Sequence, residues 1–141
     1  MITYQRTTDL SKSAEITYYN MQSYYDHYNV DWKLETIEEQ IVNLENWDIL
    51  YDGILIGAIR LGFESDCCYI RDLQVSENFQ NKGIGKSALG KCNQLAKESG
   101  LSRIRLRVFK ISPAIHLYER TGFLIDKDED NFYYMSRNVA E

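Results

Sequence analysis

The chain has 141 residues, 44% of them hydrophobic, and a net charge of −5. This length suits one domain with one core, and the hydrophobic content excludes a disordered chain. The acidic balance argues against a general nucleic-acid binder. Because there is no apolar run of membrane-spanning length and no signal-peptide pattern, we expect a cytoplasmic protein with a single domain over residues 1–141.

The cysteines and histidines are few and scattered. Cys67, Cys68 and Cys92 are odd in number and lack CxxC spacing, which predicts neither a disulfide framework nor a zinc site. His27 and His116 lie far apart in the sequence, so we expect no metal.

Hydrophobic periodicity predicts the elements in chain order. They are a strand over residues 2–7, helices over 10–28 and 34–44, strands over 47–52, 54–63 and 67–75, a helix over 84–99, a strand over 103–109, a helix over 113–121, and strands over 123–126 and 132–139.

Turn and capping residues punctuate these elements. Thr36 and Glu39 have the spacing of a capping box for the second helix. Asp52-Gly53 predicts a hairpin turn, and Gly100 a helix stop. The run KDEDN predicts the loop of a final hairpin.

The strand–helix–strand unit over residues 67–109 predicts two parallel neighbouring strands. The other strands follow one another through short turns and are expected to be antiparallel. The fold class is therefore α/β (α+β), with a mixed, mostly antiparallel sheet of about seven strands, flanked by about four helices on both faces.

The turn QNKGIG, from Gln80 to Gly85, joins a strand to a helix. Backbone N–H groups at a helix start are unpaired and carry partial positive charge, and glycines let a ligand approach them closely. Lys82 and Lys86 add charge. The turn therefore predicts a phosphate site, with a glycine-relaxed turn that holds no ligand as the alternative.

Two motifs resemble the GNAT superfamily of acetyl-CoA-dependent N-acetyltransferases. QNKGIG matches its pattern [QR]-x-x-G-x-[GA] and follows Leu73-Gln74-Val75, as in the family. AIHLYERTGF, from Ala114 to Phe123, matches a second family run on a late helix. The resemblance is strongest from Tyr69 to Phe123, and the order of elements fits the family fold from end to end.

The resemblance implies that acetyl-CoA is the co-substrate. It assigns the pantetheine arm to backbone groups of the strand and the pyrophosphate to backbone N–H groups of the turn. The cofactor-binding positions are Leu73, Gln74, Val75, Gln80, Asn81, Lys82, Gly83, Ile84, Gly85 and Lys86.

Tyr118 matches the family tyrosine that often protonates the leaving thiolate. The alternative is an aromatic side chain packed on the sheet. For the base, Asp72 is a candidate because it lies beside the expected thioester position. Glu64 and Glu35 are weaker candidates, and a water chain without a single base is equally compatible with the sequence.

Two positions depart from common family patterns. Ile111 stands where many members have asparagine, which puts polar positioning there in doubt. Leu106 stands where ribosomal-protein N-terminal acetyltransferases tend to place a glutamate base, so that sub-family is disfavoured.

The acceptor is expected to be a primary amine of a small molecule or peptide. By resemblance, the aromatic run from Thr17 to Trp32 forms one wall of the acceptor site. Tyr24, Tyr25, Tyr28 and Trp32 are candidates to hold a cationic amine by cation–π contact, although packing of such rings on the sheet is the commoner role.

The remaining chemistry-bearing residues are read as structural. Arg103, Arg105 and Arg107 share one face of a strand, where they are expected to be solvated or at an interface; pairing with acidic groups and, given the resemblance, binding of the CoA 3′-phosphate are the alternatives. Cys68 and Cys92 lack an activating histidine and are expected in the core. The sequence thus predicts an N-acetyltransferase, and a homodimer is compatible with the resemblance. A non-catalytic acyl-CoA-binding module is the alternative.

Overall fold

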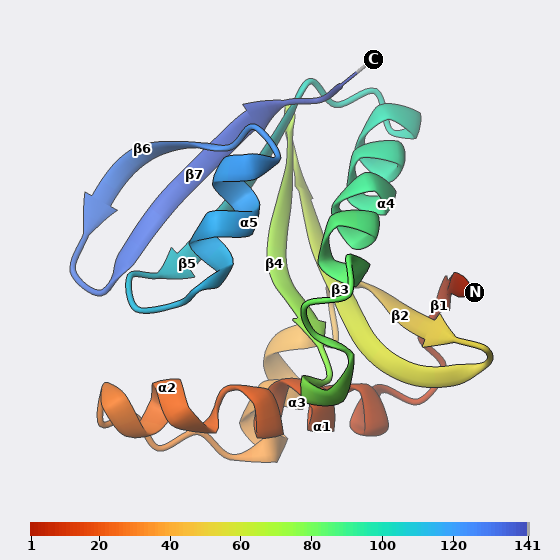
Figure 1. The fold of residues 1–141 in the computed structure, drawn as a ribbon, viewed down its shortest axis with the longest axis vertical. Coiled ribbons are helices and arrows are strands. Elements are labelled where there is room, and N and C mark those ends of the chain that lie inside the picture. The colour runs from red at the N-terminus through yellow and green to blue at the C-terminus, as the bar shows by residue number, and fades with distance from the viewer. Residues whose placement is uncertain (141) are drawn as a thin grey trace. The chain divides into compact units, whose positions relative to one another are not determined.

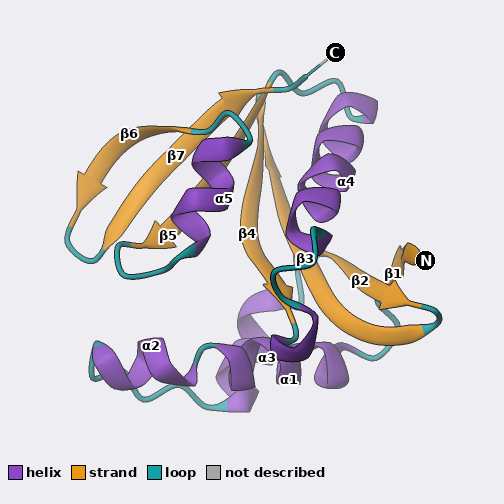
Figure 2. Cartoon of the chain, in the orientation of Figure 1, coloured by secondary structure: helices purple, strands orange, loops and turns teal. Residues whose placement is uncertain are grey.

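The computed structural model describes residues 1–140, which form seven strands, five α-helices and one 3-10 turn (Figures 1 and 2). No helix in this range is long and apolar enough to cross a membrane. In chain order, the helices and strands are β1 (Ile2–Arg6), α1 (Leu10–Asn20), α2 (Gln22–His27), α3 (Leu34–Ile41), β2 (Glu45–Tyr51), β3 (Ile54–Glu64), β4 (Cys67–Val75), η1 (Glu77–Phe79), α4 (Ile84–Glu98), β5 (Arg103–Phe109), α5 (Ala114–Arg120), β6 (Leu124–Glu129) and β7 (Phe132–Asn138).

The strands form one mixed sheet in the order β1-β2-β3-β4-β5-β7-β6. β4 and β5 are parallel, in register from Cys67 opposite Arg103 to Ile70 opposite Leu106. The pairs β1–β2, β5–β7 and β6–β7 are antiparallel. The predicted fold class and the parallel crossover are confirmed.

The chain divides into two compact units. The first unit comprises Met1–Arg60 and Asp72–Gly85. Its helical core buries Ala14 of α1 against Ile37 and Ile41 of α3. Partly buried apolar side chains surround these three: Leu10, Tyr18, Tyr25, Trp32, Leu34 and Leu44.

The second unit comprises Leu61–Arg71 and the chain from Lys86 onward. Its strand β5 alternates as the sequence predicts, burying Ile104, Leu106 and Val108 on one face. The apolar face predicted for α4 is also buried: Ala88, Cys92, Leu95 and Ala96 lie in this unit, and Ile84 in the first. The expectation of one domain stays a prediction.

The long helix predicted over residues 10–28 is wrong as a single element. It is broken at Met21, which has φ −95° and ψ 0° between α1 and α2. Just before the break, the Asn20 side chain donates hydrogen bonds to Gln74 and to the Val75 carbonyl. Periodicity cannot register this tertiary contact, because the apolar spacing continues through the break.

Two local predictions also differ from the structure. Thr36 lies inside the first turn of α3, which begins after Lys33 and has no side-chain cap, so the capping box does not form. The final hairpin loop is shorter than KDEDN because β6 continues to Glu129. The turn is tight because Asp130 adopts a positive φ of 51°.

Candidate functional site

The glycine turn lies in the first unit, between β4 and α4. Gln80 ends the 3-10 turn, and Asn81 and Gly83 follow with φ values of 61° and 79°. α4 begins at Ile84, one residue after the last of these positive values. Two left-handed residues therefore stand directly before the helix start.

The space beside Gly83 is not filled by protein. A Cβ built on Gly83 would meet no heavy atom within 4 Å. The N–H groups of the first turn of α4 have no partner within the helix, because helices leave their first four N–H groups unpaired. This open space beside the first N–H groups of α4, called the cradle below, leaves room for a bound phosphate.

The end of β4 has a defined orientation. A Cβ on Gly57 of β3 would lie 2.4 Å from the Gln74 carbonyl oxygen, and the Ser76 N–H donates to the Ile56 carbonyl at 2.7 Å. The backbone groups of Gln74 and Ser76 therefore point towards β3. Because successive backbone groups alternate between the two edges of a strand, those of Leu73 and Val75 lie on the edge away from β3.

Two side chains fix the last carbonyl on that edge. Asn20 Nδ2 and Gln80 Nε2 each donate to the Val75 oxygen at 2.9 Å. Both lone pairs of this carbonyl are thereby used. The backbone groups of Leu73 and the N–H of Val75 are then the ones that a ligand strand can meet on this edge.

A buried arginine underlies β4. Arg60 of β3 is 0% exposed, and all five of its N–H donors are engaged. Its Nε contacts Asp72 at 3.2 Å, and its Nη1 reaches Ser13 Oγ at 2.9 Å and Asn46 at 3.1 Å. Its Nη2 donates to the Ser13 carbonyl at 2.9 Å and to Thr17 at 3.0 Å. Burial lowers the pKa of Arg60, and Asp72 opposes that shift.

Asp72 is held from three directions. Besides Arg60, Thr17 Oγ1 donates to its Oδ2 at 2.6 Å and Gln74 Nε2 to its Oδ1 at 2.7 Å. The Gln74 contact confirms that residues 72 and 74 share a face of β4. Both carboxylate oxygens of Asp72 are thus already engaged by neighbouring side chains. Its role as base stays a prediction.

Of the four aromatic residues of the predicted acceptor wall, two stack on each other. Tyr25 and Trp32 stack at 5.8 Å between ring centroids and pack against the helical core. Tyr28 instead meets His27 edge to face at 4.7 Å. Burial, and then the charge of Asp72, raises the pKa of Tyr25 to about 12. Tyr24 is half-buried in α2.

A hollow of about 290 Å³ opens beside this stack. Its lining is Tyr25, Asp26, Asn29, Val30 and Asp31. It combines one aromatic side chain with two carboxylates, and both kinds of group attract a cation.

In the second unit, Tyr118 lies in α5 and is 7% exposed. Its ring meets Phe123 edge to face at 5.7 Å. The ring of Tyr118 is thus packed against another aromatic side chain, as the alternative to the acid role expects. The role of its hydroxyl as the general acid stays a prediction.

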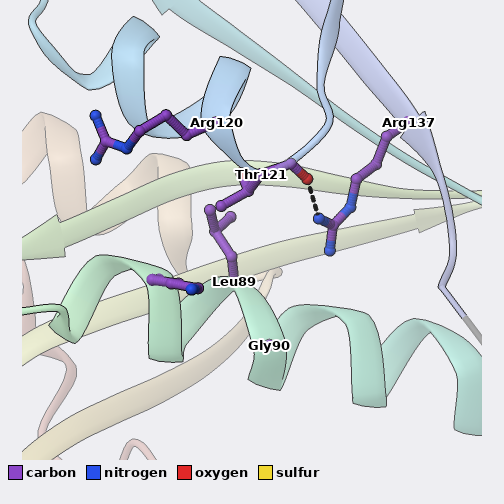
Figure 3. Close-up of a pocket in the computed structure, with 6 residues that line it drawn as sticks. Leu89, Gly90, Arg120, Thr121 and Arg137 are labelled. Carbon is purple, nitrogen blue, oxygen red and sulfur yellow. Dashed lines mark hydrogen bonds between the residues drawn. The ribbon is translucent and has the colours of Figure 1, made fainter.

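A cationic pocket of about 270 Å³ lies in the same unit (Figure 3). Arg137 of β7 donates from Nη1 to the Thr121 carbonyl after α5, while its buried Nε has no hydrogen-bond partner among the described residues. Burial lowers the pKa of Arg137. The lining is Lys86, Leu89, Gly90, Arg120, Thr121 and Arg137, a set that offers three cations to an anionic ligand.

The weaker candidates take separate places. Glu64 pairs with Arg71 at 3.1 Å, and Glu35 lies in the first turn of α3. Ile111 is 47% exposed. Cys68 and Cys92 are both buried, which confirms the core reading of these two thiols.

The sequence analysis missed Arg60, Asn20 and Gly57. The first two act through contacts with residues far away in the chain, and neither belongs to a local motif. Gly57 had a weak signal, since a glycine inside a strand often marks close approach of another backbone.

Comparison with known proteins identifies relatives by sequence. The profile of the acetyltransferase (GNAT) family matches residues 8–123. Streptothricin acetyltransferase from Streptomyces lavendulae is 32% identical over 75 residues, which are 51% of this chain and 40% of that protein. Uncharacterized protein YxbD of Bacillus subtilis is 29% identical over 77 residues, which are 54% of this chain and 47% of that protein. The chain thus spans less than half the length of these curated relatives.

Solved structures share the fold. PaiA N-acetyltransferase from Thermoplasma acidophilum, in complex with coenzyme A, superposes with a TM-score of 0.79 at 20% identity, covering 98% of this chain and 99% of that one. The ribosomal-protein-S18-alanine N-acetyltransferase from Escherichia coli gives 0.78 at 16% identity, covering 100% and 96%. At these identities the likeness establishes the fold alone.

We expect Arg60→Met to destabilise the protein by about 3–5 kcal/mol, because it leaves Asp72 partly buried without its cation. Arg71→Met is the matched control, since it removes the same side chain from an exposed pair with Glu64 and is expected to cost at most about 1 kcal/mol. Urea unfolding of both variants at neutral pH measures the difference. Equal losses would show that the buried network has no special weight.

Proposed function

Because this chain belongs to the acetyltransferase (GNAT) family, we propose that it moves an acetyl group from acetyl-CoA to a primary amine. The observation that carries the proposal is the family match over residues 8–123, which includes both motifs. The open cradle beside Gly83 supports it, because protein atoms leave room there for a ligand at the start of α4.

Acetyl-CoA supplies an acetyl thioester, which an amine attacks directly. The pyrophosphate is assigned to the turn from Gln80 to Lys86, where N–H groups at the start of α4 meet negative charge. Gly83 allows close approach because it lacks a Cβ that would project into the cradle.

The pantetheine arm is assigned to the free edge of β4. The backbone groups of Leu73 and the N–H of Val75 face away from β3, so they are the strand groups suited to pair with an extended ligand. A backbone N–H there also stabilises the negative charge that develops on the thioester oxygen during attack. Asn20 and Gln80 keep this end of the strand in place through the Val75 carbonyl.

The cationic pocket of the second unit is assigned to an anionic group. Lys86, Arg120 and Arg137 supply the positive charge, and the Nε of Arg137, which has no hydrogen-bond partner among residues 1–140, provides a buried donor. Anionic ligands pair well with guanidinium groups because their N–H donors are fixed in a planar fork.

Proton transfers complete the reaction. Tyr118 is assigned as the general acid that protonates the departing thiolate. The amine must lose a proton before it attacks, and Asp72 is the carboxylate nearest in sequence to the proposed thioester-binding residues. Since Asp72 already accepts hydrogen bonds from Arg60, Thr17 and Gln74, we assign proton removal to water and a positioning role to Asp72.

The acceptor is proposed to be a small molecule or peptide that carries a cationic amine. The hollow beside Tyr25, with Asp26 and Asp31, supports a cation. A relative named for acetylating streptothricin supports a small-molecule acceptor, although it aligns over only 40% of its length. Three buried cysteines without a disulfide among the described residues suit a reducing compartment, and we place the reaction in the cytoplasm.

The test of this function is thiol release from acetyl-CoA across polyamines, aminoglycosides, amino acids and short peptides. We expect at least one cationic amine to give turnover. If acetyl-CoA binds and no amine releases thiol, the second candidate gains: a non-catalytic acyl-CoA-binding module. The engaged carboxylate of Asp72 favours that alternative. If acetyl-CoA does not bind at all, the proposal fails.

Gly83→Ala is expected to weaken acetyl-CoA binding about tenfold or more, because its Cβ would enter the proposed pyrophosphate cradle. Gly100→Ala is the matched control, since Gly100 also has a positive φ, of 72°, and open space around its missing Cβ. Both variants therefore carry similar backbone strain. Isothermal titration should separate them, and equal affinities would refute the assignment of the turn.

Tyr118→Phe is expected to lower kcat about 100-fold while the affinity for acetyl-CoA stays within about twofold, because only the phenolic hydroxyl group is removed. The ring contact with Phe123 is retained. Steady-state kinetics with the best amine, and binding measured separately, check both parts. Full activity of the variant would reject Tyr118 as the acid.

A further inference from the structure

The arginines of β5 lie on a face of the sheet that the proposed reaction does not use. Arg105 and Arg107 are exposed, on the opposite face from the buried Leu106. The strand registers place Tyr69 of β4 beside Arg105, and Tyr134 of β7 beside Arg107. We call this surface the arginine face: Tyr69, Arg71, Arg105, Arg107, Phe132 and Tyr134.

Aromatic rings hold two of these cations flat against the sheet. The Arg71 guanidinium lies over the Tyr69 ring, and the Arg107 guanidinium lies over the Phe132 ring, each at 4.0 Å from the centroid. Stacking on a ring restricts a guanidinium while its N–H edges stay free to donate. The arginine face is thus partly pre-organised for planar anions such as carboxylates.

Two arginines of the arginine face have no acidic partner among the described residues. Glu64 pairs with Arg71, and Glu129 pairs with Lys127 of β6. Within residues 1–140, neither Arg105 nor Arg107 has a carboxylate oxygen within 4.0 Å. Two exposed guanidinium groups on one strand face therefore lack a counter-charge.

We propose that the arginine face docks an acidic polypeptide in extended conformation, with carboxylates at alternate positions. Arg105 and Arg107 are two residues apart on one strand, so their Cα atoms lie about 6.8 Å apart. Side chains on one side of an extended peptide repeat at the same interval. Such a peptide, lying along β5, presents one carboxylate to each arginine, in a bidentate geometry that guanidinium favours.

Charge favours a peptide over a nucleic acid. The chain carries a net charge of −5, which repels a long polyanion, whereas a short acidic segment meets only the local field. The rings of Tyr69 and Phe132 are also covered by arginines, so these two rings do not offer bare faces for base stacking.

The experiment measures fluorescence anisotropy of labelled short peptides with the intact protein at neutral pH. One probe alternates glutamate with alanine, and a second has the same composition with its glutamates in one block. We expect the alternating probe to bind several-fold more tightly, and Arg105→Gln/Arg107→Gln to weaken that binding about tenfold. The control, Lys12→Gln/Lys97→Gln, removes the same charge from exposed helical positions and should leave binding unchanged.

Four results would overturn the proposal. They are no binding of the alternating probe, equal affinity for both probes, equal losses in the two double variants, and tighter binding of an oligouridylate, which would indicate a nucleic-acid surface. Thermal unfolding of both double variants checks that each is folded. No acetyl-CoA is present, so the outcome is independent of the proposed acetyl transfer.

Discussion

The first unit depends on the burial of one positive charge. Removing a guanidinium from water costs several kcal/mol, so Arg60 is tolerable only with every donor engaged. Its partners come from α1, β2 and β4, and these three elements must meet β3 in one arrangement to supply them. The same arrangement places Asp72 and Gln74 at the end of β4. The geometry proposed for cofactor binding therefore rests on a charge that takes no part in the chemistry.

The proposed co-substrate contacts in the first unit are made mostly by the backbone. Leu73, Val75 and the turn around Gly83 present N–H groups, and the side chains nearby orient them. Asn20 and Gln80 illustrate this division, since the side-chain amides of both donate a hydrogen bond to one carbonyl of β4. This explains why a short pattern of glycines can indicate the site, because the contacts come from backbone groups that any residue carries. It also explains why the acceptor cannot be inferred from the turn.

The sequence predicted every strand, the parallel crossover and the glycine turn, because each has a local signal in periodicity or in glycine placement. It did not predict the break at Met21 or the network of Arg60. Arg60 appears in the sequence as a single charge within the apolar run ILIGAIRLGF, and its burial becomes intelligible only when Ser13 and Thr17 are brought against it. Contacts of this kind depend on long-range packing, so no window of neighbouring residues contains them. The stacked rings below Arg71 and Arg107 likewise require the strand order.

Local fields, more than net charge, decide what this protein can attract. The first 52 residues hold ten acidic and three basic residues, and the remainder hold eleven and thirteen. At physiological salt the field of an exposed charge decays over about 8 Å, so the hollow at Asp26 and Asp31 and the arginine face each act on the part of a partner that lies against them. A cationic amine and an acidic polypeptide are therefore compatible partners of one chain. A peptide with a free amine and alternating carboxylates carries both chemistries, and each surface recognises one of them by itself.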